Sequence, residues 1–176
     1  MYIYDRLTEN AQDHSTTESV MLEFFEYNNY GKKDDVVLIQ VTNPLLRGIN
    51  LEWLYEITYL NGGYDSALTV APSRHFMWSS LGQPLNYNPV NRPMRQDIDP
   101  FYIENGAAYI TEVGTLMTTK SRLSGRIGIS KMPFYTSHEL DEPEDWKILE
   151  AIQLDTQGAR VAKLREYTRT FYKDTV

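Results

Sequence analysis

Two carboxylates in the last third of the chain have a spacing that suits a divalent cation. Glu139 and Asp141 lie two residues apart, and in an extended segment the side chains at i and i+2 point to the same face. A hard cation such as Mg²⁺ takes one or two carboxylates together with the phosphates of a substrate. The pair therefore predicts a magnesium site, and the alternative is a solvated strand end.

A second candidate site is the turn that follows an apolar run at residues 36–41. Gln40 and Asn43 stand at this turn, and their amides both donate and accept hydrogen bonds. Open α/β sheets bind ligands beyond the carboxyl ends of their strands. We therefore expect these amides to contact a ligand, and the alternative is a turn satisfied by its own side chains.

A third cluster places arginine beside aromatic residues. Arg92, Arg95 and Gln96 lie close together in the chain, and Tyr87 and Tyr102 flank them. Arginine binds carboxylates through two parallel hydrogen bonds, so the cluster suits an anionic, hydroxyl-rich ligand. Arginine-rich arms also make subunit contacts, which is the alternative interpretation.

The elements that must position these residues alternate between strands and helices, which predicts an α/β fold. Strands are expected at residues 1–4, 36–41, 65–71, 102–111 and 127–132, and helices after a capping box at 15–18, at 50–60 and at 144–153. The run at 36–41 is typical of a strand that is buried on both faces. The proline-rich stretch at 72–100 predicts an arm that leaves the sheet and contains short strands such as 75–79.

Composition excludes several classes of protein. A chain of 176 residues fits one domain, here expected at 1–156, followed by a basic amphipathic helix at 157–176. The absence of cysteine excludes disulfide scaffolds and thiol catalysis. A net charge of −7 argues against nucleic-acid binding. Because no signal peptide or membrane-spanning run is visible, we expect a cytoplasmic protein without a membrane role.

Several motifs, taken in order, resemble those of the acylneuraminate cytidylyltransferase family. Residues 39–45 (IQVTNPL) are similar to the family's Leu-Gln-Pro-Thr-Ser-Pro-Leu segment. The resemblance continues, over about residues 6–152, at 5–6 (DR), 11–13 (AQD), 95–97 (RQD), 102–110 (YIENGAAYI), 125–128 (GRIG) and 139–146 (ELDEPEDW). The order and spacing of these motifs make the resemblance far more specific than any one of them.

The resemblance implies a Rossmann-like nucleotidyltransferase sheet of the GT-A type with a dimerisation arm at 72–100, hence a homodimer. It also implies a reaction, in which a sialic-acid-like (nonulosonic) sugar attacks the α-phosphate of CTP and pyrophosphate leaves. By motif position Glu139 and Asp141 hold Mg²⁺, although the family more often has Asp at the first of these positions.

The same motif positions assign the remaining site residues. Gln40 is expected to contact the sugar, with Gln96 and Asn105 as further contacts. Arg95 shares the Arg-Gln-Asp signature, and Arg6 and Thr17 are expected near the nucleotide.

The resemblance further predicts an N-terminal truncation. The family opens with a strand and a loop of the type Pro-Ala-Arg-Gly-Gly-Ser-Lys, which binds the triphosphate of CTP, and the 176 residues contain no such loop. One hypothesis is therefore a cytidylyltransferase that is inactive alone or is completed by a separate N-terminal fragment. The alternatives are a non-catalytic sugar-acid-binding or assembly protein derived from this family, and a related nucleotidyltransferase that acts on another sugar acid.

Overall fold

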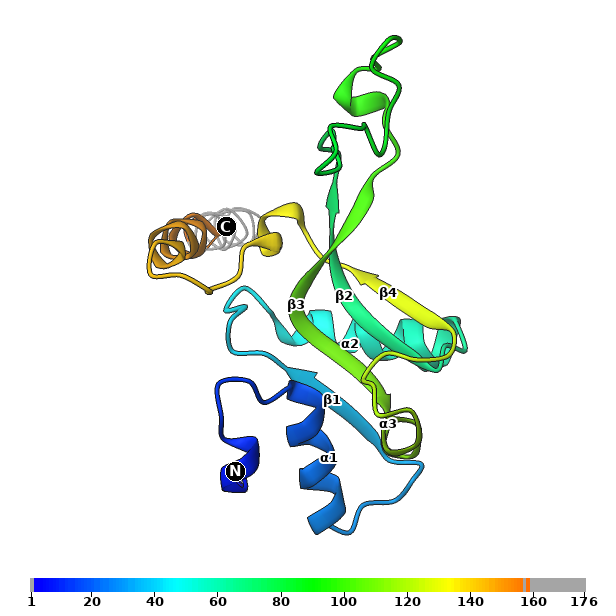
Figure 1. Cartoon of the computed structure of the whole chain (residues 1–176), viewed down its shortest axis with the longest axis vertical. Coiled ribbons are helices and arrows are strands. Elements are labelled where there is room, and N and C mark those ends of the chain that lie inside the picture. The colour runs from blue at the N-terminus through cyan, green and yellow to red at the C-terminus, as the bar shows by residue number, and fades with distance from the viewer. Residues whose placement is uncertain (1, 157, 159–176) are drawn as a thin grey trace, which may run out of the picture.

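The computed structural model describes residues 2–156 and 158, which form an open four-stranded sheet with helices packed against it (Figure 1). The strands are β1 (Asp35–Ile39), β2 (Ser66–Ser73), β3 (Phe101–Glu112) and β4 (Ile127–Lys131), in the spatial order β1-β3-β2-β4. β3 runs antiparallel to β1 and β2, whereas β2 and β4 are parallel. The expected α/β class is confirmed. β3 lies between β1 and β2, which run in the same direction but do not pair with each other.

Two of the three α-helices, α1 and α2, have bounds close to those expected from the sequence, whereas α3 was not expected. The helices are α1 (Thr17–Tyr27), α2 (Gly48–Tyr55), which continues as a π-helical turn over Glu56–Asn61, and α3 (Val113–Thr119). Residues 145–156 are also helical. Three 3₁₀ turns lie at Thr8–Asn10, Arg95–Asp97 and Phe134–Ser137.

The start of α1 differs from the expected capping box by one residue. Thr16 is the N-cap, and its Oγ1 accepts a hydrogen bond from the backbone N–H of Ser19 at 3.1 Å. Glu18 forms an ion pair with Arg122 at 3.4 Å. A hydroxyl therefore caps the helix as predicted, but the carboxylate interacts with another part of the chain.

The core lies on both faces of the sheet because side chains alternate along β2 and β3. On the face covered by α2, Leu54 packs against Ala67, Ala108 and Ile110, all of which are buried. On the opposite face a second cluster joins Leu68, Val70 and Tyr109. The inner halves of β2 and β3 thus form the buried centre from which the loops extend.

The prediction that residues 36–41 form a strand buried on both faces was wrong. β1 lies at an edge of the sheet that the described residues form, and Val37 and Ile39 are 42% and 50% exposed. β1 nevertheless has the composition of a central strand, because neither lysine nor proline interrupts it. Natural edge strands commonly carry such residues to prevent further pairing.

The strand expected at residues 1–4 was also wrong for the described residues 2–4. This segment instead packs on α1, where the Tyr4 hydroxyl donates a hydrogen bond to Glu23 at 2.8 Å. Glu23 also accepts hydrogen bonds from the Leu7 backbone and the Asn10 amide. Burial and the Glu23 carboxylate raise the pKa of Tyr4 to about 12.

The segment between β2 and β3 protrudes from the sheet, as Figure 1 shows in green. The outer part of β3 is exposed and pairs with the end of β2, so a two-stranded ribbon carries the protrusion. The expected short strand at 75–79 is absent from it, apart from one isolated bridge between Trp78 and Pro84. Arg92 stacks on Phe76 at 4.1 Å, which uses its guanidinium face within the arm.

The basic amphipathic helix expected at 157–176 lies outside the described residues, except for residue 158. Among the residues that the structure describes, no helix has both the length and the apolar character that a membrane span requires.

Candidate functional site

Three chain segments meet where β1 ends and β3 bends. The turn after β1 carries Gln40 and Asn43, the middle of β3 carries Asn105, and the segment after β4 carries Glu139 and Asp141. The backbone N–H of Gln40 donates to the carbonyl of Ala107 at 3.2 Å, which joins the turn to β3. The structure thus brings together five of the nine site residues predicted from the sequence.

An irregularity in the sheet makes this meeting possible. Leu68 pairs with Tyr109 and Val70 pairs with Glu104, so Thr69 alone faces a stretch of four residues in β3. Gly106 lies within that stretch at φ +60°, a left-handed conformation that glycine adopts without strain. The resulting bulge turns Asn105 inward and places Gly106 against the side chain of Glu139.

The two carboxylates are held by their own backbone. Leu140, which lies between them, donates its N–H to the carbonyl of Thr42 at 2.8 Å. The carboxylate of Asp145 accepts hydrogen bonds from the N–H groups of Asp141 and Glu142 at 3.1 and 2.8 Å. These bonds lower the pKa of Asp145, with the Glu142 N–H as the larger cause.

Negative charge accumulates at Glu139. Burial raises the pKa of the Glu139 carboxyl, and the charges of Asp141 and Glu104 raise it further. A cation placed between Glu139 and Asp141 would relieve this repulsion. Across residues 2–156 and 158, no group of three or more histidine or acidic side chains is arranged to hold a metal ion, so the pair offers two protein ligands.

Asn43 and Asn105 are buried rather than facing solvent. Their exposed fractions are 2% and 0%. The Nδ2 group of Asn43 donates to the carbonyls of Asn105 and Thr136 at 2.6 and 2.9 Å. Both asparagines are therefore bonded within the chain, and the ligand contact expected of them from the sequence has no exposed surface to support it.

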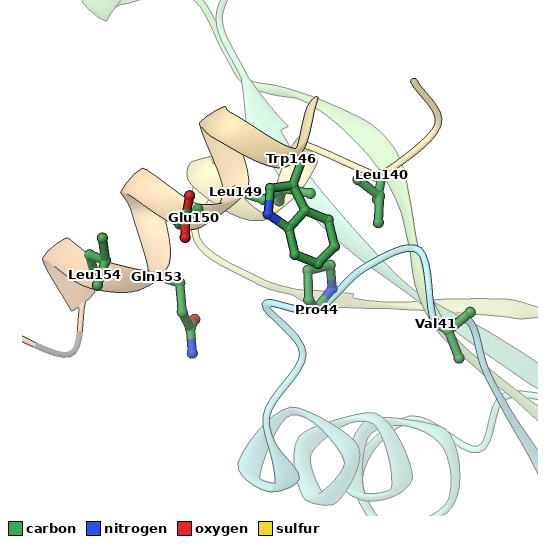
Figure 2. A pocket seen from close by; sticks show the side chains of 8 residues that line it. All are labelled: Val41, Pro44, Leu140, Trp146, Leu149, Glu150, Gln153 and Leu154. Atoms are coloured by element: carbon green, nitrogen blue, oxygen red, sulfur yellow. The ribbon is translucent and has the colours of Figure 1, made fainter. Parts of the chain in front are cut away.

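A cavity of about 520 Å³ lies beside the carboxylate pair. Figure 2 shows the helical stretch 145–156 facing the turn after β1 across this cavity, with Trp146 close to Pro44. Leu140 also lines it, so the cavity adjoins the segment that carries Glu139 and Asp141. Its wall is mainly apolar, and Glu150 and Gln153 are the polar side chains on it.

The other predicted site residues lie elsewhere. Arg6 lines a second cavity of about 350 Å³ between the N-terminal segment, α1 and β1. Thr17 is the first residue of α1. Arg95 and Gln96 form part of the 3₁₀ turn on the protruding arm, away from the turn after β1 (Figure 1).

Sequence reasoning missed Glu104, Tyr109 and Arg122. Glu104 accepts a hydrogen bond from the Tyr109 hydroxyl, and Arg122 lies 4.3 Å above the Tyr109 ring. Burial, followed by the Glu104 carboxylate, raises the pKa of Tyr109. Because the bulge separates Glu104 from Tyr109 along β3, no simple spacing rule pairs them in the sequence.

The contact between Gly106 and Glu139 gives a direct test of the site's geometry. A Cβ at residue 106 would collide with the Glu139 carboxylate, so Gly106→Ala is expected to push that side chain out of place. The left-handed backbone alone should cost about 1–2 kcal/mol. We therefore expect a lower unfolding temperature in calorimetry. We also expect weaker binding of Mn²⁺, which favours the same oxygen ligands as Mg²⁺ and serves as its probe.

Gly82→Ala is the matched control for this substitution. Gly82 also has a positive φ, +74°, but a Cβ there meets nothing within 4 Å. Gly82→Ala should therefore lose only the stability that the left-handed backbone costs, and it should leave Mn²⁺ binding unchanged. Equal Mn²⁺ affinity in the two variants would contradict the proposed placement of Glu139.

Comparison with known proteins identifies relatives of the chain. No family model matches the chain. An N-acylneuraminate cytidylyltransferase of Oncorhynchus mykiss is 30% identical over 155 residues, which cover 84% of this chain and 35% of the relative. The Danio rerio protein of the same name, form A, is 27% identical over 155 residues, with the same two shares. A Streptococcus agalactiae serotype V relative, also so named, is 25% identical over 147 residues, or 80% of this chain and 35% of the relative. The chain thus spans about a third of the length of the curated relatives that it matches.

Proposed function

Because the chain belongs, over its aligned residues, to the acylneuraminate cytidylyltransferase family, we propose that it takes part in transferring CMP from CTP to a sialic-acid-like (nonulosonic) sugar. In this reaction the anomeric hydroxyl of the sugar attacks the α-phosphate of CTP, and pyrophosphate leaves. The observation that carries the proposal is the Glu139–Asp141 pair, held beside the turn that bears Gln40.

Mg²⁺ fits the residues at this site. Glu139 and Asp141 supply the one or two carboxylates that Mg²⁺ takes beside substrate phosphates, and the repulsion acting on Glu139 favours a bound cation. The ion would neutralise phosphate charge during the transfer. The chain's own contribution is to hold the two carboxylates in place through Leu140 and Asp145.

Gln40 is the proposed sugar contact. It is partly exposed at the end of β1, and its amide offers both a donor and an acceptor to hydroxyl groups. Arg6 and Thr17 are proposed near the nucleotide, and the cavity lined by Arg6 supports room for a ligand or chain segment there. Asn43 and Asn105 are buried and hydrogen-bonded within the chain, so neither is proposed as a sugar contact.

The arm at residues 72–100 is proposed to form a homodimer. Apolar side chains project from it into solvent, among them Leu81 at 84% and Val90 at 95% exposed. Isolated exposed apolar residues are common, but a group of them on one protrusion favours a protein contact. Arg95 and Gln96 lie on the same arm, so a dimer would carry them to the partner.

A further polypeptide segment is proposed to complete the nucleotide site. β1 is an edge strand of the sheet that the described residues form, and its Val37 and Ile39 side chains are about half exposed, which favours the addition of a further strand. Such a segment would carry the backbone N–H groups and basic side chains that a triphosphate needs. Losing one stabilising group of this kind commonly slows a reaction by about 10²–10³-fold.

Pyrophosphate release is the measurement that tests the function. The full chain is incubated with CTP, Mg²⁺ and a panel of nonulosonic acids, with and without a strand–loop–helix fragment that bears the family's triphosphate loop. Release that requires the fragment, and that Glu139→Gln abolishes, supports an enzyme completed by a second segment. No release in either condition would exclude the enzymatic function.

The non-catalytic alternative has a separate readout. A protein that only binds sugar acids would show calorimetric binding of one panel member without pyrophosphate release in either condition. A panel member other than a sialic acid that is turned over best would instead favour a related nucleotidyltransferase with a different sugar-acid substrate.

A further inference from the structure

Three buried polar residues join the segments that form the candidate site. Asn43 comes from the turn after β1, Asn105 from the bulge in β3, and Thr136 from the 3₁₀ turn after β4. Each is at most 2% exposed. Their side chains therefore act on other protein groups rather than on a ligand.

The three residues form one hydrogen-bonded network. Asn43 donates to the carbonyls of both Asn105 and Thr136. Asn105 in turn donates to the hydroxyl of Thr136 at 3.1 Å and accepts a hydrogen bond from Thr69 at 2.8 Å. The Thr136 hydroxyl donates to the carbonyl of Pro133 at 2.7 Å.

The network borders the carboxylate pair at two points. Thr42, next to Asn43, accepts the backbone hydrogen bond of Leu140. Gly106, next to Asn105, lies against the Glu139 side chain. A shift of Asn43 or Asn105 would therefore move Thr42 or Gly106, the residues that contact the segment carrying Glu139 and Asp141.

Stability alone does not explain why these side chains are polar. Within the described residues, the Oδ1 atom of Asn43 is buried and accepts no hydrogen bond. An unsatisfied buried acceptor is costly, whereas replacing a whole polar group by apolar ones of the same shape is often neutral. The network is better explained by the geometry that it imposes on the three segments.

We propose that Asn43, Asn105 and Thr136 are positioning residues that fix the Glu139–Asp141 pair relative to the turn carrying Gln40. This inference rests on the proposed function, because it assigns the pair a cation. Outer-shell hydrogen bonds of this kind orient the groups that bind a metal.

Thr136→Val and Thr58→Val form a matched pair of variants. Each removes a hydroxyl that is at most 1% exposed and that donates to a backbone carbonyl, Pro133 for Thr136 and Leu54 for Thr58. Only Thr136 also accepts from Asn105. Mn²⁺ is the probe, because it favours the same oxygen ligands as Mg²⁺ and is paramagnetic.

Mn²⁺ titration of the full chain, followed by electron paramagnetic resonance, measures the affinity, and calorimetry measures the unfolding temperature. We expect Thr136→Val to weaken Mn²⁺ binding by about 10-fold or more, and Thr136→Ser, which keeps the hydroxyl, to restore it. Thr58→Val should lower the unfolding temperature to a similar extent and leave Mn²⁺ affinity unchanged.

The possible outcomes separate the network from the metal pair. If wild-type protein binds Mn²⁺ and Thr136→Val binds it equally well, the positioning role is wrong and the metal pair stands. If both valine variants weaken binding equally, the effect is general destabilisation and the positioning role is also wrong. Wild-type protein that binds no Mn²⁺ would overturn the metal pair and, with it, the inference.

Discussion

Asp141→Asn is expected to weaken Mn²⁺ binding by at least about 100-fold. Loss of a partner that only orients a ligand costs about 10–100-fold in metal affinity, so loss of a direct carboxylate ligand should cost more. Asparagine keeps the size of the side chain and removes its charge. The backbone hydrogen bond from residue 141 to Asp145 does not depend on that side chain, so the local fold should persist.

Glu142→Gln is the control for this substitution. Glu142 is exposed, is adjacent to Asp141, and carries the same charge. If the two carboxylates bind the cation directly, Glu142→Gln should change Mn²⁺ affinity only slightly, since exposed charges are screened by solvent and salt. Equal losses in the two variants would mean that the acidic stretch attracts cations only through its total charge.

The sequence predicts the regular elements well where a local pattern determines them. The apolar runs at β2 and β4 and the helical spacing in α1 depend on neighbouring residues, and the strands and helix lie there. The carboxylate pair is likewise visible as a local i, i+2 spacing. Gly106, against which the Glu139 side chain lies, is 33 positions upstream of Glu139, and no local rule connects these two residues.

Asn105 shows why the role of a residue is harder to predict than its neighbourhood. Its position near the site follows from the motif at 102–110. Its burial follows from the bulge opposite Thr69, which depends on how β2 and β3 pair across more than thirty residues. A polar residue near a ligand edge therefore can be either a contact or a support, and only the three-dimensional pairing distinguishes them.

β1 shows a different limit of sequence reasoning. Its run of Val and Ile side chains correctly predicts a strand, and it also predicts burial on both faces, which the described residues do not provide. Composition reports the surroundings for which a strand is suited. β1 is suited to burial on both faces, yet in the described residues its apolar side chains Val37 and Ile39 are about half exposed at the edge of the sheet.

The exposed edge of β1 is expected to drive self-association of the chain. The full chain is expected to form assemblies larger than a dimer in sedimentation velocity, with a concentration dependence. A free strand edge without lysine or proline is a template for another strand, and the arm is a separate proposed contact. Replacing Val37 and Ile39 together by lysine should block strand addition at β1 and leave a dimer joined through the arm.

Val90→Lys is the variant that separates the two contacts. Val90 lies on the arm, 95% exposed and distant in sequence from β1, so its lysine should weaken the arm dimer without protecting the edge. Combining all three lysines should then give a monomer.

If a strand–loop–helix fragment is added to wild-type protein, it should compete with self-association by occupying the β1 edge. If the wild-type chain sediments as a stable monomer at all concentrations, both contacts are contradicted. If the large assemblies persist when Val37 and Ile39 are replaced by lysine, β1 is not their cause.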